Sequence, residues 1–139
     1  MSQTASLRIC VTCRRDPEAA AAPEERDGAR LYARLEAERQ RLAEAGIGLS
    51  EVRCLSGCKR ACTALLTGAG KWSYVLCEVD PETAAGDLVD YAERYAASAD
   101  GQVAWRERPE SLRRKTLARI PPLEPAAPTS DTNERDEAA

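Results

Sequence analysis

Two groups of cysteines, each at the end of a stretch with the pattern of a β-strand, constrain the fold of this chain most strongly. Residues 7–11 alternate apolar and polar side chains around Cys10, and residues 49–53 lead directly into Cys54. Between them, Asp27-Gly28 opens a helical pattern that ends near Gly46, with leucines on one face and Arg and Glu on the other. A strand, a helix and a second strand in this order predict a parallel βαβ unit.

Three further elements are predicted after the second cysteine group. Residues 64–67 and 72–79 have the composition of strands, and the Gly68-Ala69-Gly70 sequence between them is a hairpin signal. Asp80-Pro81 predicts a helix start, and the helical pattern continues to about Ala97. The order β-α-β-β-β-α predicts a thioredoxin-like α/β domain, in which helices flank a small mixed sheet.

The composition changes twice along the chain and predicts three segments. Residues 1–100 are expected to form the thioredoxin-like domain. Residues 101–120 form a basic extension, in which Leu112, Leu117 and Ile120 predict one apolar edge of a short helix. Residues 121–139 are dominated by Pro, Ala, Thr, Ser and acidic residues and are expected to be a disordered tail.

The residue types point to metal chemistry in the cytoplasm. Met1–Ala5 contains no basic n-region or long apolar run, and no stretch has the length of a membrane span. In that compartment six cysteines indicate metal or redox chemistry more than disulfides. The absence of histidine excludes Cys-His nucleophilic catalysis and mixed Cys/His zinc sites. A net charge of −3 gives no support for a nucleic-acid partner.

The predicted topology gathers most of the cysteines at one place. The two strand ends of a parallel βαβ unit are neighbours, which brings together Cys10, Cys13, Cys54, Cys58 and Cys62. Thiolates are the usual ligands of iron–sulfur clusters and of structural zinc, and the spacing alone does not separate the two. Basic residues close to them in sequence favour the thiolate form and offset the charge of a cluster: Arg14, Arg15, Arg53, Lys59 and Arg60. Cys77 lies inside a predicted strand and is expected to be a buried apolar residue.

Two protein families share these motifs. The strand-linked cysteines and the Cys54-x-x-x-Cys58 turn resemble the thioredoxin-like 2Fe–2S ferredoxins. The chain is also similar to an uncharacterised bacterial family of small metal-binding proteins, in the motifs Cys10-Val11-Thr12-Cys13, residues 54–62, residues 70–75, residues 105–109 and residues 120–123. The resemblance implies Cys10, Cys13, Cys54 and Cys58 as cluster ligands. Cys62 is an additional metal ligand or a substitute for Cys13, and this choice stays open.

The resemblance implies an electron carrier and not an enzyme. Its cofactor would be a 2Fe–2S cluster, and its partner a redox protein that docks on the basic residues near the cluster. The alternative is a metal-binding or metal-delivery protein that holds zinc or another thiophilic ion on the same cysteines, in cobalamin-related metabolism. The oligomeric state stays open, with a homodimer as one option. A thiol–disulfide active site at Cys10-x-x-Cys13 is disfavoured, because no proline occurs between Pro23 and Pro81.

Overall fold

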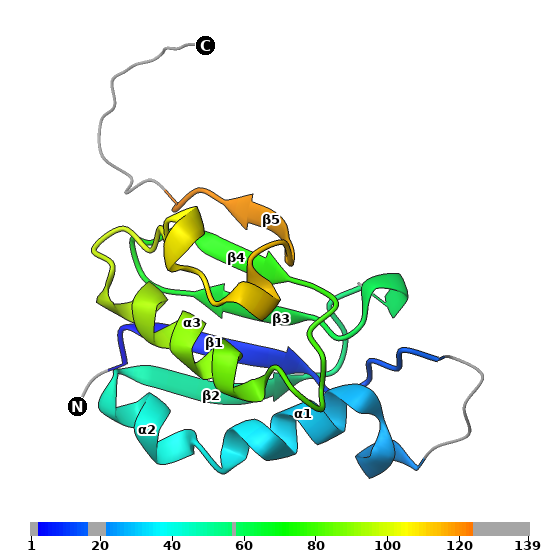
Figure 1. The fold of residues 1–139 in the computed structure, drawn as a ribbon. Helices are drawn as coiled ribbons and strands as arrows, with labels where there is room; N and C mark the ends of the chain where they lie inside the picture. Colours follow the sequence, from blue (N-terminus) through cyan, green and yellow to red (C-terminus); the bar gives the residue numbers. More distant parts are fainter. Residues whose placement is uncertain (1–2, 17–21, 57, 124–139) are drawn as a thin grey trace.

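The computed structural model describes residues 3–16, 22–56 and 58–123. Its centre is a five-stranded sheet in the order β2-β1-β3-β4-β5 (Figure 1). The strands are β1 Ala5–Cys10, β2 Ile47–Val52, β3 Ala64–Thr67, β4 Ser73–Leu76 and β5 Thr116–Ile120. β1 and β2 run parallel, and every other neighbouring pair is antiparallel. The mixed sheet and its helices confirm the predicted α/β fold class.

Three helices lie against one face of the sheet (Figure 1). α1 Asp27–Glu36 and α2 Arg39–Glu44 form the crossover between β1 and β2, and α3 Ala85–Ala97 follows β4. β1 shows which face is covered, because Leu7 and Ile9 are fully buried while Arg8 between them is exposed. The core is therefore a single layer between the sheet and the helices.

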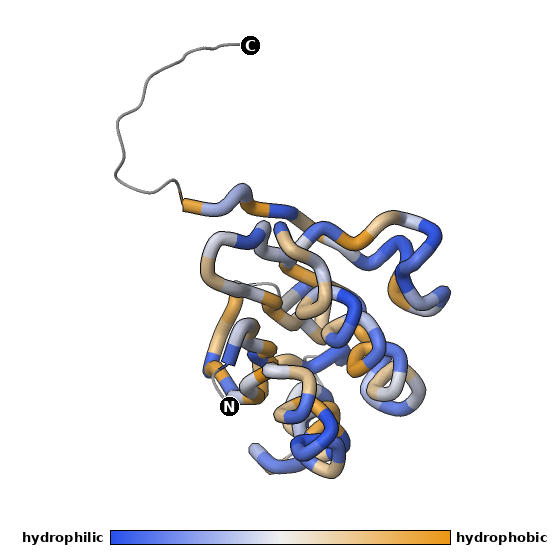
Figure 2. Tube along the Cα trace, turned by 90° about the vertical axis from the view of Figure 1, so that its left-hand side faces the viewer, coloured by the Kyte–Doolittle hydropathy of each residue, from blue (hydrophilic) through white to orange (hydrophobic). Residues whose placement is uncertain are grey.

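Leucines of the crossover helices and three tyrosines fill this layer. Tyr74 of β4 packs edge-on against Tyr91 and Tyr95 of α3, with ring centroids 5.9 Å apart in both pairs. Edge-to-face pairs add about 0.5–1.5 kcal/mol each beyond area burial. Tyr74 accepts a hydrogen bond from the Val103 amide at 3.0 Å, so its buried hydroxyl is satisfied. Figure 2 shows apolar and polar residues mixed along the chain, as expected when each element turns one side toward the core and the other toward solvent.

The predicted short helix in the basic extension is wrong. The chain there forms two 3₁₀ turns, η3 Trp105–Glu107 and η4 Glu110–Leu112, and then strand β5, which pairs with β4. Leu112 is fully buried, whereas Leu117 and Ile120 are 46% and 49% exposed, so the three side chains share no apolar edge. The helix does not form because pairing with β4 overrides the local pattern of the segment. Strand pairing satisfies the backbone groups at the edge of β4.

Two further predictions concern the start of α3 and the C-terminal tail. α3 begins at Ala85 instead of directly after Asp80, because the Asp80 carboxylate accepts the Glu82 amide at 2.8 Å and forms a local turn first. The predicted tail lies outside the described residues from position 124 onward.

Gly28 lets α1 pack directly against the end of β1. A Cβ atom at this position would lie 2.0 Å from the backbone oxygen of Cys10. The Gly28 amide also donates a hydrogen bond to the Cys13 carbonyl at 3.0 Å. Any side chain at position 28 would therefore push α1 away from the cysteines.

We predict that Gly28→Ala destabilises the fold by about 3 kcal/mol, because backbone atoms must move to admit the methyl group. Gly86→Ala is the matched control, since a Cβ at Gly86 would meet no atom within 4 Å. In α3 this change should cost nothing and add up to about 1 kcal/mol of stability. Urea unfolding followed by circular dichroism measures both values, and equal effects of the two substitutions would contradict the prediction.

Candidate metal centre

Parallel pairing of β1 and β2 brings two cysteine-bearing loops to the same end of the sheet. We call residues 10–16 the first cysteine loop and residues 53–63 the second. The Val11 amide donates to the Val52 carbonyl at 3.0 Å, and the Thr12 hydroxyl donates to the Arg53 carbonyl. The sulfur of Cys10 lies 4.0 Å from the same Arg53 oxygen. Cys10 and the residue that precedes Cys54 are therefore in contact, as the βαβ prediction requires.

Thr63, at the end of the second loop, connects both cysteines of the first. Its carbonyl accepts the Cys10 amide at 3.2 Å, and its hydroxyl lies 3.4 Å from the Cys13 sulfur. Thr63 is fully buried. A buried hydroxyl needs a hydrogen-bond partner, and the Cys13 sulfur supplies it.

The remaining cysteines differ in depth. Cys62 is fully buried, and its carbonyl accepts the Val79 amide at 3.0 Å. Cys54 is exposed, and its sulfur accepts the Ser56 amide of its own loop at 3.2 Å. Cys58 begins the 3₁₀ turn η2 Cys58–Arg60, and its side chain lies outside the described part. Cys77 is buried directly after β4, as predicted.

Burial sets the acidity of the inner thiols. It raises the pKa of Cys13 to about 11, against the hydrogen bond with Thr63. It also raises the pKa of Cys62 to about 12, and the neighbouring Cys13 adds to this increase by charge repulsion. Burial acts in the same direction on Cys10, but hydrogen bonds with Thr12, Cys13 and the backbone outweigh it and lower the pKa of Cys10. Cys10 is thus the inner thiol best prepared to form a thiolate.

The donor set fits a thiophilic metal group in its chemistry. Each described cysteine is a free thiol, and three of them, Cys10, Cys13 and Cys62, are buried around Thr63. Within the described part of the chain, no three cysteine or carboxylate side chains converge closely enough to hold a metal ion. Cys54 contacts its own loop, so a ligand set that includes it requires its side chain to turn toward Cys10.

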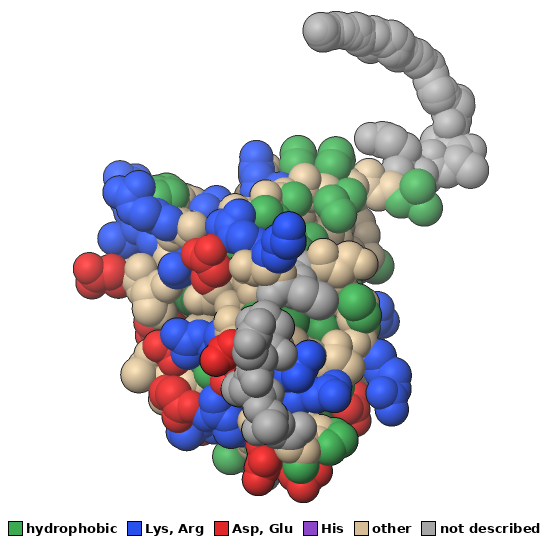
Figure 3. Space-filling model, turned by 90° about the vertical axis from the view of Figure 1, so that its right-hand side faces the viewer, with side chains coloured by type: hydrophobic (Ala, Val, Ile, Leu, Met, Phe, Trp, Pro, Cys, Tyr) green, Lys and Arg blue, Asp and Glu red, His purple; other side chains and the backbone are tan. Residues whose placement is uncertain are grey.

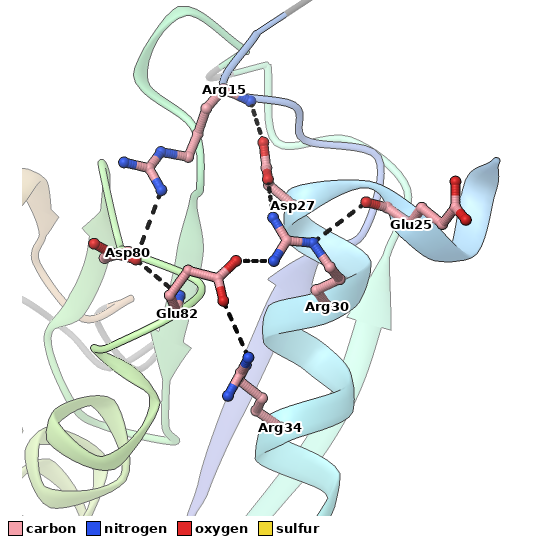
Figure 4. A network of polar contacts seen from close by, with 7 residues as sticks. All are labelled: Arg15, Glu25, Asp27, Arg30, Arg34, Asp80 and Glu82. Atoms are coloured by element: carbon pink, nitrogen blue, oxygen red, sulfur yellow. Dashed lines mark hydrogen bonds and ion pairs between the residues drawn. The ribbon is translucent and has the colours of Figure 1, made fainter. Parts of the chain in front are cut away.

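A network of charged side chains fixes the far end of the first cysteine loop (Figure 4). The Arg15 amide donates to the Asp27 carboxylate at 2.6 Å, and the Arg15 guanidinium pairs with Asp80 at 3.6 Å. Arg30 of α1 pairs with both Asp27 and Glu82. The loop is therefore tied to α1 and to the turn before α3.

Sequence reasoning missed three residues that shape this site: Thr12, Gly28 and Thr63. Gly28 and Thr63 are distant in sequence from Cys13, which both contact, so no local pattern identifies them. The position of Thr63 between Cys62 and the predicted strand 64–67 is the one available signal. Among the described residues after Cys13, the first α-helix is α1, which begins at Asp27.

Comparison with known protein families identifies the family to which the chain belongs. A family model described as "Protein of unknown function (DUF1636)" matches residues 7–122. The chain belongs to the DUF1636 family. No curated protein matches the chain. The resemblance to an uncharacterised family is thus confirmed.

Two solved structures resemble this DUF1636 protein in fold. One is described as a thioredoxin-like 2Fe–2S ferredoxin from Aquifex aeolicus, with 12% identity and a TM-score of 0.52 over 85% of this chain and 94% of that chain. The other is the wild-type thioredoxin-like 2Fe–2S ferredoxin from the same organism, with 13% identity and a TM-score of 0.51 over 84% and 99%. The likeness confirms the thioredoxin-like fold. Among the described helices, none is long and apolar enough to cross a membrane.

We predict that iodoacetamide alkylates Cys54 before Cys13 and Cys62 in the reduced, metal-free protein at pH 8. Cys54 is exposed, whereas Cys13 and Cys62 are buried and remain protonated until the pH approaches their raised pKa values of about 11 and about 12. Their alkylation should lag by more than about tenfold and should accelerate as the pH rises. Peptide mapping by mass spectrometry gives the order, and early labelling of Cys62 would contradict it.

Proposed function

We propose that this DUF1636 protein holds a 2Fe–2S cluster on cysteine thiolates and carries single electrons to or from a partner enzyme. The observation that supports this most directly is the contact between Cys10 and Arg53, because it brings the two cysteine loops to one end of a sheet. All-thiolate sites of this kind suit iron–sulfur clusters. The shared fold with thioredoxin-like 2Fe–2S ferredoxins is consistent with the proposal.

The proposed ligands are Cys10, Cys13, Cys54 and Cys58. Cys10 and Cys13 belong to the loop that α1 holds in place, and the depressed pKa of Cys10 favours its ligating form. Cys62 is the alternative to Cys13, since both are buried beside Thr63. Once bound, the cluster would supply one-electron redox chemistry, while the protein sets its potential through hydrogen bonds, charge and exposure.

Zinc, or another thiophilic ion held for storage or delivery, is the alternative cargo for the same thiols. Four cysteines satisfy tetrahedral zinc as well as a cluster. Anaerobic purification separates the two readings, because only an iron–sulfur cluster absorbs in the visible region and bleaches with dithionite. A colourless protein with stoichiometric zinc after anaerobic handling would overturn the electron-transfer proposal.

We predict that serine substitution at Cys10, Cys54 or Cys58 removes most of the visible absorbance after iron–sulfur reconstitution. Cys77→Ser is the control and should leave the absorbance unchanged, since the charged groups that act on Cys77 among the described residues are Arg60, Glu78 and Lys115. Cys13→Ser and Cys62→Ser decide the fourth ligand, because the ligand variant should lose the cluster and the other should keep it. Iron and sulfide content measures each result.

We also predict that Thr63→Val lowers the midpoint reduction potential. A ligating Cys13 sulfur carries no proton, so the Thr63 hydroxyl at 3.4 Å must act as the donor. Such a bond stabilises the more negative reduced state, and valine removes it while keeping the shape of the side chain. Thr67→Val, at the other end of β3, is the control. An unchanged potential in a fully loaded Thr63→Val protein would argue that Cys13 is not a ligand.

A further inference from the structure

Three cations beside the cysteines have no acidic partner. Arg14 follows Cys13, Arg53 precedes Cys54, and Lys59 follows Cys58. Across residues 3–16, 22–56 and 58–123, these side chains form no ion pair or hydrogen bond with another residue. Arg53 and Lys59 are exposed, and Arg14 is half-buried. The end of the molecule that carries the cysteines therefore presents positive charge that the described protein does not neutralise.

Several arginines on the helices behave differently, although Arg94 of α3 has no partner among the described residues. Arg34 of α1 pairs with Glu82 at 3.1 Å, Arg39 pairs with Glu36 at 3.2 Å, and Arg41 reaches Asp90 and Glu93 of α3 at 2.7 and 2.8 Å. Nearer the cysteines, Arg60 and Lys115 share Glu78. The net charge of the chain is −3, so the unpaired cations at the cysteine end form a locally positive region on a protein that is acidic overall. Figure 3 views this end, where Lys and Arg side chains lie on both sides of the grey segment with acidic ones among them.

A cleft beside Arg53 offers an unused donor as well. It has a volume of about 530 Å³, and its polar lining consists of Thr12, Glu24, Arg26, Tyr32, Glu51 and Arg53. The Nε of Arg26 is buried and has no hydrogen-bond partner in the described protein. Buried donors are almost always satisfied, so the Nε of Arg26 is an exception in the described protein, and it is not exposed to solvent.

From these observations we propose that the cysteine end is the docking face for an acidic protein, whose carboxylates contact Arg14, Arg53 and Lys59. The inference rests on the proposed electron-transfer function and names the chemistry of the partner. Exposed charges interact weakly across water within one molecule but steer the encounter of two. Docking at this face would bring the partner's redox centre close to the cysteines. One electron would then pass from the reduced cluster to the oxidised partner centre, with no bond or proton exchanged.

The first test measures binding without any cluster. Calorimetry at low salt compares the affinity of an octaglutamate peptide for the wild type, for Arg14→Gln/Arg53→Gln/Lys59→Gln, and for Arg8→Gln/Arg94→Gln/Arg106→Gln. The control triple removes the same charge from exposed cations that also lack a partner in the described chain but do not flank a cysteine. We expect the first triple to weaken binding about tenfold and the control less than about twofold. Equal losses, or no binding to the wild type, would overturn the docking face.

The second test uses electron transfer to small ions of opposite charge. Each reduced cluster gives one electron to ferricyanide, which becomes ferrocyanide, or to the tris(phenanthroline)cobalt(III) cation, which becomes cobalt(II). The first triple should slow the reaction with ferricyanide about tenfold at low salt and accelerate the reaction with the cobalt complex. The midpoint potential should fall only slightly, because solvent screens the exposed side chains of Arg53 and Lys59.

The outcomes separate the two proposals. A wild-type protein that assembles no cluster contradicts the proposed function, while octaglutamate binding still decides on the docking face. A loaded protein whose rates respond equally to both triples overturns the docking face and leaves the proposed function standing. A large shift of potential with unchanged rates would assign the cations to the cluster itself and would also overturn docking. Circular dichroism of each variant verifies the fold.

Discussion

The parallel pairing of β1 with β2 is the constraint on which the rest of this structure depends. Two parallel strands require a crossover on one face of the sheet, and α1 and α2 provide it. The same pairing makes both strands end at one edge, so the segments that follow them must lie together. The Val11–Val52 backbone hydrogen bond and the contact between Cys10 and Arg53 are direct results. Site and fold therefore share a single cause.

The core that supports this edge is thin but specific. The chain has no Phe and one Met, so large side chains come from leucine and tyrosine. Tyrosine brings a polar hydroxyl group into the core, where it needs a hydrogen-bond partner. The Tyr74 hydroxyl, for example, accepts a hydrogen bond from the Val103 amide. Lys71, which is also buried, donates to the Ala96 carbonyl at the end of α3 at 2.7 Å. Interior polar groups thus connect the end of the sheet opposite the cysteines to the last turn of α3.

The sequence predicts the elements with local signatures and fails where distant parts of the chain decide. Alternation of side chains and leucine spacing predict β1, β2 and the crossover helix, and the cysteines at strand ends follow from them. The helix predicted around Leu117 fails because pairing with β4 overrides the local pattern. The roles of Gly28 and Thr63 could not be predicted from the sequence for the same reason, since their contacts with Cys10 and Cys13 exist only in the folded chain. The ligand set of five cysteines stays a prediction, and the side chain of Cys58 lies beyond the described part.

The two cysteine loops differ in how firmly they are held, and this has a consequence for affinity. Gly28 and Asp27 fasten the first loop to α1, whereas Cys54 is exposed and its sulfur accepts a hydrogen bond from Ser56 of its own loop. In the proposed site, the first loop would be ordered before an ion arrives, and the segment around Cys54 would lose conformational entropy on binding. Selectivity among metals would then reside in the first loop, through its burial and hydrogen bonds. Overall affinity would be adjustable through substitutions around Cys54 that leave the buried Cys62 and Thr63 in place.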